Sequence, residues 1–154
     1  IIRFRSEYRE YFEEQMTQRG LNFEVLNKYR YQVLLSKGHP LAQKETLQRS
    51  DLTDLPEIVH GDTFRQSGQQ EQRVTRKIYT VDRLAQLSLL EKIPNSYMWA
   101  SSMPDRCLRR WGFVQKACSD NQVIYHDAIA YNAQYNMSEI ESEFLTYLFD
   151  HYHK

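Results

Sequence analysis

The residue pair in this sequence that most resembles a reactive site is His126-Asp127, inside the run VIYHDAIAY. Imidazole and carboxylate groups bind catalytic metal ions, so the pair invites comparison with metal-dependent phosphohydrolases. Successive side chains of a strand point to opposite faces, however, and the two groups would not share a metal ion without further ligands. We therefore expect an ordinary surface pair, and an enzyme that uses His126 or Asp127 is the weaker alternative.

The hydroxyl and thiol side chains form no recognisable catalytic motif. Ser36, Ser67 and Ser101 are isolated, and the sequence has no nucleophile elbow, phosphate-binding loop or dinucleotide fingerprint. Cys107 and Cys118 have neither the spacing nor the neighbouring histidines of a zinc site, so free thiols are expected. The residues therefore predict a protein that is not an enzyme and that uses no cofactor and no metal ion.

Composition and charge narrow the class of protein further. The 154 residues are 41% hydrophobic, which is enough for one domain or two small lobes. Twenty basic and twenty acidic side chains give a net charge of zero, which argues against a general nucleic-acid binder. No apolar run approaches the length of about 18 residues that a membrane span needs, and no signal peptide opens the chain, so a cytoplasmic protein without a membrane partner is expected. The chain opens Ile1-Ile2-Arg3 without a methionine, which suggests a piece of a longer protein.

Strand and helix patterns alternate along the chain. This order predicts an α/β fold with a largely parallel sheet flanked by helices. The expected strands cover 1–4, 23–36 with a bend near 27–28, 57–60, 77–81, 96–101, 113–118 and 122–131. The expected helices cover 7–19, 46–55, 82–93, 102–111 and a last segment from 138 onward.

Helix ends and helix faces can be predicted at several positions. Capping boxes are expected at Ser102-x-x-Asp105 and Ser138-x-x-Glu141, and Gly112 should end the helix that begins at the first of them. Apolar positions at helical spacing should face the core, and they are Leu84, Leu87 and Leu90 in one helix and Ile140, Phe144, Leu145 and Leu148 in the last.

Short polar or turn sequences follow four of the predicted strands. Ligands of open α/β sheets bind beyond the carboxyl ends of strands, where hydroxyl, guanidinium and backbone N–H groups can hold a small anion. The four stretches are Arg3-Phe4-Arg5, Ser36-Lys37-Gly38, Gly61-Asp62-Thr63-Phe64 and Ala100-Ser101-Ser102.

The segment VLLSKGHPLA, followed by LQRSDLTDLPEIV, resembles the LysR-type transcriptional regulators. In that family a strand is followed by His-Pro-Leu-Ala, then by a short helix with an Asp-Leu pair, and then by a strand that opens with proline. The corresponding residues are His39 to Ala42, Asp51-Leu52 or Asp54-Leu55, and Pro56 to Val59.

Two later segments extend the resemblance over nearly the whole chain. TVDRLAQLSLLEKIPNSYMWASSMP is similar to the family's helix–strand segment, and SEIESEFLTYLFDHY to its closing helix. Glu91 to Asn95 stand where the family usually has a glycine-rich turn, so the geometry of that turn is not carried over. The resemblance implies a complete second lobe over 37–121 and a partial first lobe over 1–36 and 122–154. The family's N-terminal helix-turn-helix and the opening strands of the first lobe are missing from the sequence.

The family implies a periplasmic-binding-protein-like fold that senses a small-molecule effector between two lobes. Effector binding would shift a hinge equilibrium, and a DNA-binding domain outside this sequence would respond. Thr63 and Phe64 match a loop that lines the cleft in family members, and Arg3, Ser36 and Ser101 join them because they stand at strand ends. An incomplete first lobe would leave an open sheet edge, so a homo-oligomer is expected. The alternative is a stand-alone small-molecule-binding α/β protein of the same fold.

Overall fold

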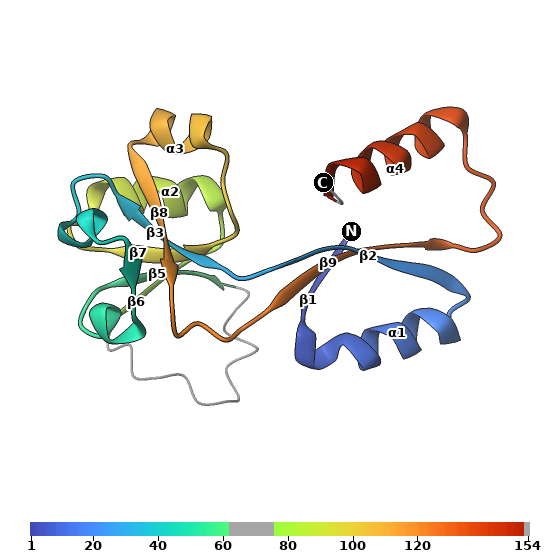
Figure 1. The fold of residues 1–154 in the computed structure, drawn as a ribbon, viewed down its shortest axis with the longest axis horizontal. Coiled ribbons are helices and arrows are strands. Elements are labelled where there is room, and N and C mark those ends of the chain that lie inside the picture. Colours follow the sequence, from blue (N-terminus) through green and yellow to red (C-terminus); the bar gives the residue numbers. More distant parts are fainter. Residues whose placement is uncertain (62–75, 153–154) are drawn as a thin grey trace. The chain divides into compact units, whose positions relative to one another are not determined.

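The computed structural model describes residues 1–61 and 76–152, and they form two units (Figure 1). Unit 1 comprises Ile1–Arg30 and Gln122–Lys154, and unit 2 comprises Tyr31–Asn121. The chain passes between the units twice, at 30–31 and at 121–122. The predicted strand over 23–36 is therefore two strands in different units. The segment 31–36 belongs to unit 2, whereas the lobe boundary was expected after Ser36.

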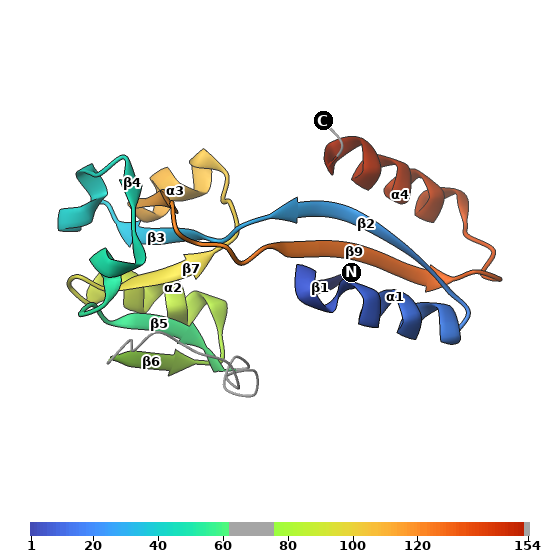
Figure 2. The same cartoon turned by 60° about the horizontal axis from the view of Figure 1, so that its bottom comes forward.

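Unit 1 is built on an antiparallel sheet of three strands, in the order β1-β9-β2. Two helices lie on opposite sides of the β2–β9 ribbon in both views of the chain (Figures 1 and 2). The elements are β1 (Ile2–Arg5), α1 (Arg9–Gln18), β2 (Leu21–Tyr29), β9 (Tyr125–Asn132) and α4 (Glu139–Tyr152).

Aromatic side chains fill the space between α1 and the sheet. The ring of Phe4 stacks on Phe12 of α1 with centroids 4.9 Å apart, and on His126 of β9 at 5.4 Å. Phe23 of β2 is a third neighbour of Phe4, at 5.8 Å, so one residue of β1 contacts rings from three other elements. Such ring pairs contribute about 0.5–1.5 kcal/mol each beyond the area they bury.

The predicted inner face of the last helix is confirmed only in part, because Leu145 and Leu148 are half-buried and the other two predicted residues are exposed. Its capping box is confirmed, because the Glu141 carboxylate accepts the Ser138 backbone N–H at 2.8 Å. Ile140 and Phe144, however, were expected to face the core and are 78% and 55% exposed, whereas Leu145 is half-buried. Each residue adds about 100° of rotation, so the buried side of α4 lies roughly one residue further around the helix than the pattern suggested.

Unit 2 is built on a sheet of six strands, in the order β4-β8-β3-β7-β5-β6. Three of its five strand pairings are parallel and the two made by β3 are antiparallel, so the α/β class is confirmed with a mixed sheet. The strands are β3 (Gln32–Ser36), β4 (Thr46–Leu47), β5 (Glu57–His60), β6 (Lys77–Thr80), β7 (Tyr97–Ala100) and β8 (Phe113–Cys118). The helices are α2 (Arg83–Lys92) and α3 (Asp105–Trp111).

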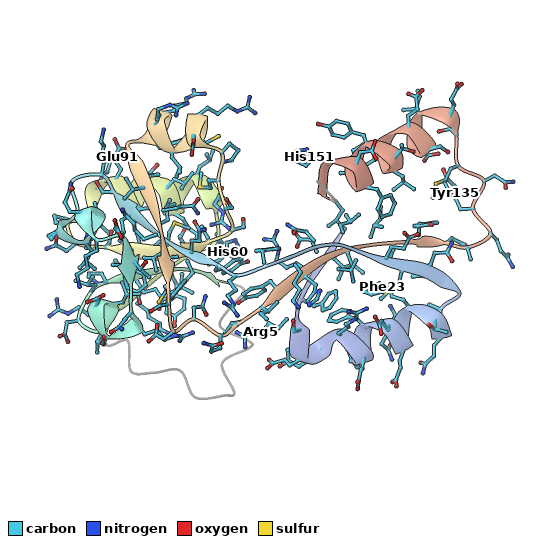
Figure 3. The ribbon with its side chains drawn as sticks, viewed as in Figure 1. Arg5, Phe23, His60, Glu91, Tyr135 and His151 are labelled. Carbon is cyan, nitrogen blue, oxygen red and sulfur yellow. The ribbon has the colours of Figure 1, made fainter. Side chains whose placement is uncertain are left out.

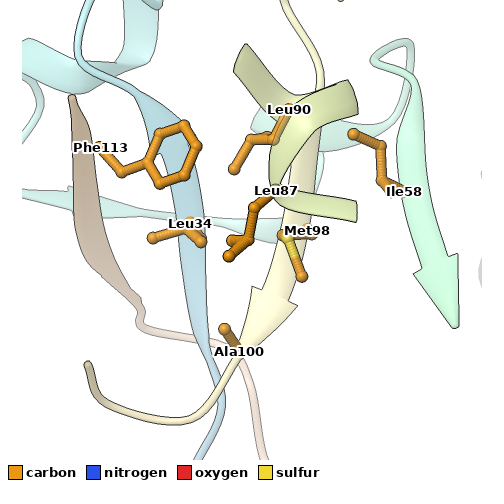
Figure 4. Close-up of a cluster of buried hydrophobic side chains, with 7 residues drawn as sticks. All are labelled: Leu34, Ile58, Leu87, Leu90, Met98, Ala100 and Phe113. Carbon is orange, nitrogen blue, oxygen red and sulfur yellow. The ribbon is translucent and has the colours of Figure 1, made fainter. Parts of the chain in front are cut away.

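Apolar clusters cover both faces of this sheet. Val33, Leu34 and Leu35 of β3 have no exposed surface, because neighbouring residues of the strand supply both clusters. The cluster beneath α2 is shown in Figure 4 and contains Leu34, Ile58, Leu87, Leu90, Met98, Ala100 and Phe113. The cluster on the other face contains Val33, Leu35, Leu47, Leu52, Tyr97 and Cys118.

The helix predicted over 46–55 is wrong. Thr46 and Leu47 form β4, which pairs in parallel with the end of β8, and a single 3-10 turn over Arg49–Leu52 follows. That turn begins with reciprocal hydrogen bonds between Gln48 and Asp51. The leucine spacing that suggested a helix instead reflects a strand and a turn that bury their leucines in one cluster.

Two details of the other unit 2 helices also differ from prediction. Leu84 is 62% exposed, because α2 meets the sheet through Leu87 and Leu90. The expected serine cap of α3 does not form, since Pro104 occupies the cap position without a side-chain hydrogen bond. Gly112 ends α3 as predicted, with the left-handed φ of 67° that glycine adopts at low cost.

Candidate functional site

Several strands of unit 2 reach the end of the sheet where the chain enters and leaves this unit. The parallel strands β5, β6 and β7 all finish there, at His60, Thr80 and Ala100. Gln32, the first residue of β3, is paired with Ala100 and so begins at the same end. We call this the junction end of unit 2, and a ligand-binding edge of an α/β sheet is expected where parallel strands finish.

Ser101 lies at the junction end, directly after β7. Its backbone carbonyl accepts a hydrogen bond from Gln115 Nε2 at 2.8 Å, and Gln115 Oε1 accepts the Met103 N–H at 2.7 Å. One glutamine side chain from β8 therefore fixes the loop that carries Ser101. A binding group on a loop that is held in place in this way loses less conformational freedom when a ligand binds than one on a flexible loop.

Ser36 lies at the opposite end of the same sheet. It pairs with Phe113, and its carbonyl accepts the His39 N–H at 3.0 Å in the turn that leaves β3. The prediction grouped Ser36 with Ser101 because both follow strands, but β3 runs antiparallel to β7. The structure therefore does not bring the two serines together. Thr63 and Phe64 lie outside the described residues.

Arg3 stands on the face of the unit 1 sheet that is opposite α1, and it is held by an acidic partner. Its Nε and Nη2 atoms donate to the two carboxylate oxygens of Asp127, at 2.7 and 2.9 Å. Tyr29 donates its hydroxyl to the same carboxylate at 3.1 Å, and the guanidinium lies 5.4 Å from the centre of the Tyr29 ring. The three side chains come from β1, β9 and β2, so they tie the three strands together on this face.

Arg5 extends the same face, because residues two apart on a strand point the same way. The Arg5 side chain is labelled in Figure 3. Its Nη1 lies 3.6 Å from the Glu7 carboxylate. Burial disfavours the charged guanidinium, but the pKa of Arg5 is raised because Tyr125 and Glu7 outweigh that cost. The Tyr29 and Tyr125 rings stack with centroids 6.3 Å apart. Two guanidinium groups thus lie beside two phenols on this face, and each guanidinium is already paired with a carboxylate of the chain, Arg3 with Asp127 and Arg5 with Glu7.

His126 and Asp127 do not form the exposed pair that was expected. They are 4% and 8% exposed, so the surface interpretation is wrong. Their opposite orientation is confirmed, since Asp127 binds Arg3 and His126 Nε2 lies 2.7 Å from Ser6 Oγ on the α1 side. Burial, followed by the positive charges of Arg9 and Lys28, lowers the pKa of His126.

The Ser6–His126 contact is one that sequence reasoning missed, because 120 positions separate the residues. A serine hydroxyl beside an imidazole is the first half of a nucleophile–base pair. Within the described ranges 1–61 and 76–152, however, His126 Nδ1 is buried without a hydrogen-bond partner, so no third group from these residues orients the ring or stabilises its charged form. The contact is better explained as a link between β9 and the turn that starts the α1 segment.

Residues 1–61 and 76–152 contain no group of three or more His, Cys, Asp or Glu side chains placed to hold a metal ion. No helix within these ranges is long and apolar enough to cross a membrane.

The fold is similar to solved regulatory domains of LysR-family proteins. The regulatory domain of MetR from Neisseria meningitidis is 14% identical, with a TM-score of 0.59 over 86% of this chain and 64% of that one. A Pseudomonas aeruginosa protein assigned to the LysR regulators is also 14% identical, with a TM-score of 0.65 over 95% of this chain and 58% of that one. The effector-binding domain of QuiR, solved with shikimate, is 18% identical, with a TM-score of 0.54 over 88% of this chain and 66% of that one.

These likenesses establish the fold. The chain spans less than two thirds of the length of each of the three solved chains. No family model matches the sequence, and no curated protein matches it. The structure therefore confirms the fold expected from the His-Pro-Leu-Ala segment: the chain has the fold of the LysR-family regulatory domains.

Proposed function

We propose that this chain is the effector-sensing part of a LysR-type transcriptional regulator and that it carries out no catalysis. The observation that supports the proposal is the shared fold with LysR-family regulatory domains, one of which was solved with shikimate. The effector would bind between the two units. The resulting conformational change would involve the two connecting segments at 30–31 and 121–122. The response would reach DNA through a helix-turn-helix domain, in the cytoplasm.

The chemistry of the two surfaces favours a small organic anion as effector. In unit 1, Arg3 and Arg5 place guanidinium groups beside the phenols of Tyr29 and Tyr125, and a ligand carboxylate would share these groups with Asp127 and Glu7. Guanidinium groups bind carboxylates in a fixed geometry, and aromatic rings favour a flat or cyclic ligand. In unit 2 the proposed contacts are Ser101 at the junction end, together with Thr63 and Phe64.

A thermal-shift screen tests this proposal. The 154-residue protein would be heated with carboxylates, phosphates, amino acids and cyclic or aromatic acids, each over a range of concentrations. A ligand that binds only the folded protein raises the melting temperature with concentration, by the equivalent of about 2.7 kcal/mol at one hundred times its Kd. We expect at least one organic acid to give a saturable shift.

Matched variants locate the site. Ser101→Ala and Thr63→Ala should weaken the shift, whereas Ser36→Ala, which removes the same hydroxyl at the opposite end of the unit 2 sheet, should leave it unchanged. A shift lost equally in Ser36→Ala and Ser101→Ala would contradict binding at the junction end. The absence of any saturable shift across the four ligand classes would contradict effector binding by this chain.

A further inference from the structure

Asn121 is the last residue of unit 2 before the chain crosses to unit 1, and its side chain is buried, with 4% of the residue exposed. Its Nδ2 donates to the backbone carbonyl of Tyr31 at 3.0 Å. Tyr31 is the first residue of unit 2 after the chain has arrived from unit 1. A single buried amide therefore links the arriving and the departing segments, which are 90 positions apart in the sequence.

The side-chain oxygen of Asn121 also takes part in a hydrogen bond. Asn121 Oδ1 accepts a hydrogen bond from Arg49 Nη2 at 3.2 Å, and the Arg49 guanidinium lies 5.7 Å from the centre of the Trp99 ring. An amide nitrogen can only donate and an amide oxygen can only accept, so the carbonyl of Tyr31 and the guanidinium of Arg49 select one orientation of the side chain. Arg49 thus holds Asn121 in the position from which it reaches Tyr31.

Hydrogen bonds at the end of β8 also hold the backbone around Arg49 and Asn121. The Asp120 carboxylate accepts the Arg49 backbone N–H at 3.0 Å and the Cys118 thiol at 3.1 Å. The Asn121 backbone N–H donates to the Cys118 carbonyl at 3.1 Å, which closes the turn that ends β8. The backbone of Arg49 and the backbone of Asn121 are therefore each held by a hydrogen bond to the end of β8 or to the turn that follows it.

We propose that Asn121, held by Arg49, is a clamp that keeps together the two chain segments joining unit 2 to unit 1. A buried asparagine is retained only where its polar groups are satisfied, and here they are satisfied by the partners that such a clamp requires. The clamp fixes where both segments leave unit 2, so it limits how independently they move. This inference concerns the unit 2 side of the connection and does not depend on the proposed function or on any ligand.

Hydrogen exchange of the whole chain tests the clamp. Asn121→Ala removes the side-chain hydrogen bonds to Tyr31 and Arg49. Asn121→Asp keeps the size and an acceptor for Arg49, but at pH 8 its carboxylate cannot donate to Tyr31. We expect both variants to raise amide exchange in 29–34 and 119–124 by about tenfold, the effect of losing one buried hydrogen bond, relative to α2 as an internal reference. Arg49→Ala should raise exchange in the same two segments.

Gln122→Ala is the matched control, because it removes a neighbouring amide side chain that is exposed. It should leave exchange in both segments unchanged. Exchange that rises equally in α2 and in the two segments would mean general destabilisation and would overturn the clamp. Wild-type exchange in Asn121→Asp would also overturn it, because the hydrogen bond to Tyr31 would then not hold the segments.

Discussion

The two units of this chain are stabilised by different means. Unit 2 has a six-stranded sheet with apolar clusters on both faces, and its central strand is buried on both sides. Unit 1 has a three-stranded sheet with an aromatic cluster on one face and, on the other, an ion pair with two tyrosines beside it. Unit 2 therefore relies chiefly on apolar burial, and unit 1 relies more on specific polar and ring contacts.

This difference bears on where binding chemistry can lie. Polar groups that are already positioned by a rigid sheet are the usual ingredients of a ligand site. In unit 1 they occupy a face of the sheet itself, while in unit 2 they are confined to strand ends such as Ser101.

Truncating Leu90, in the core of unit 2, should cost much more than truncating Leu148, a half-buried leucine on α4 of unit 1. Leu90 has no exposed surface, and Leu90→Ala should lower the free energy of unfolding by about 2–5 kcal/mol. Leu148 on α4 is half-buried, and Leu148→Ala should cost about 1 kcal/mol. Urea titration followed by circular dichroism measures both. Equal losses would contradict the stated difference between the units.

Removing the acidic partner of Arg3 should be the most damaging polar change in unit 1. Asp127→Ala leaves Arg3 and Tyr29 without the carboxylate that binds both, which should cost about 1–3 kcal/mol, less than for a fully buried pair because the Arg3 side chain is 43% exposed. Asp127→Asn keeps an acceptor and should cost less. Urea titration of the two variants measures the order, and a neutral Asp127→Ala would contradict the proposed role of the pair in tying the strands.

Acid should lower the stability of both units, in each case through protonation of one buried histidine. Burial lowers the pKa of His39 in unit 2 and, with Arg9 and Lys28, that of His126 in unit 1. The unfolded chain then binds protons first, so stability is complete above pH of about 6.5 and falls as the pH drops from there toward the folded-state pKa values. The melting temperature should decrease over that range.

Two substitutions separate the contributions of these histidines. His39 Nδ1 accepts the Leu41 N–H at 3.0 Å, and His39→Asn offers another acceptor that does not titrate. His126→Gln keeps a polar group beside Ser6. Each variant should melt with a weaker pH dependence than the wild type. An unchanged pH profile in both would show that other groups cause the acid sensitivity.

The smallest effect on stability is expected for the exposed stripe of α4. Ile140, Phe144 and Tyr147 are all more than half exposed. Phe144→Ser should change the unfolding free energy by less than about 0.5 kcal/mol. It should nevertheless reduce self-association, measured by sedimentation velocity over a concentration series, because exposed apolar stripes promote contact between copies. A monomeric wild type at every concentration would contradict the expected homo-oligomer.

Local patterns in the sequence predicted much of the fold. Strands β5 and β8 match their predicted bounds, and the Ser138–Glu141 capping box and the Gly112 helix end form as expected, because each depends on residues close in sequence. Direction within the sheet could not be predicted in this way. The antiparallel course of β3 separated Ser36 from Ser101, and no local pattern encodes strand direction.

The contacts that define the candidate site could not be predicted from local sequence patterns either. Arg3 could be selected from its position at a strand end, but its partner Asp127 is 124 positions away and had been assigned to the surface. The Asn121–Tyr31 hydrogen bond likewise joins distant segments. Side chains so far apart in sequence come into contact only when the strands pair in the folded sheet. That strand pairing could not be predicted from the local sequence pattern.

The proposed sensing of a small organic anion by both units is tested most directly by nuclear magnetic resonance. Backbone amide shifts of the isotope-labelled chain would be followed while an organic acid selected by the thermal-shift screen is added. Binding by both units should give saturable shifts with one common Kd at Arg3 and Arg5 in unit 1 and at Ser101 in unit 2, with Ser36 unaffected. Shifts confined to one unit, or centred on Ser36, would contradict it.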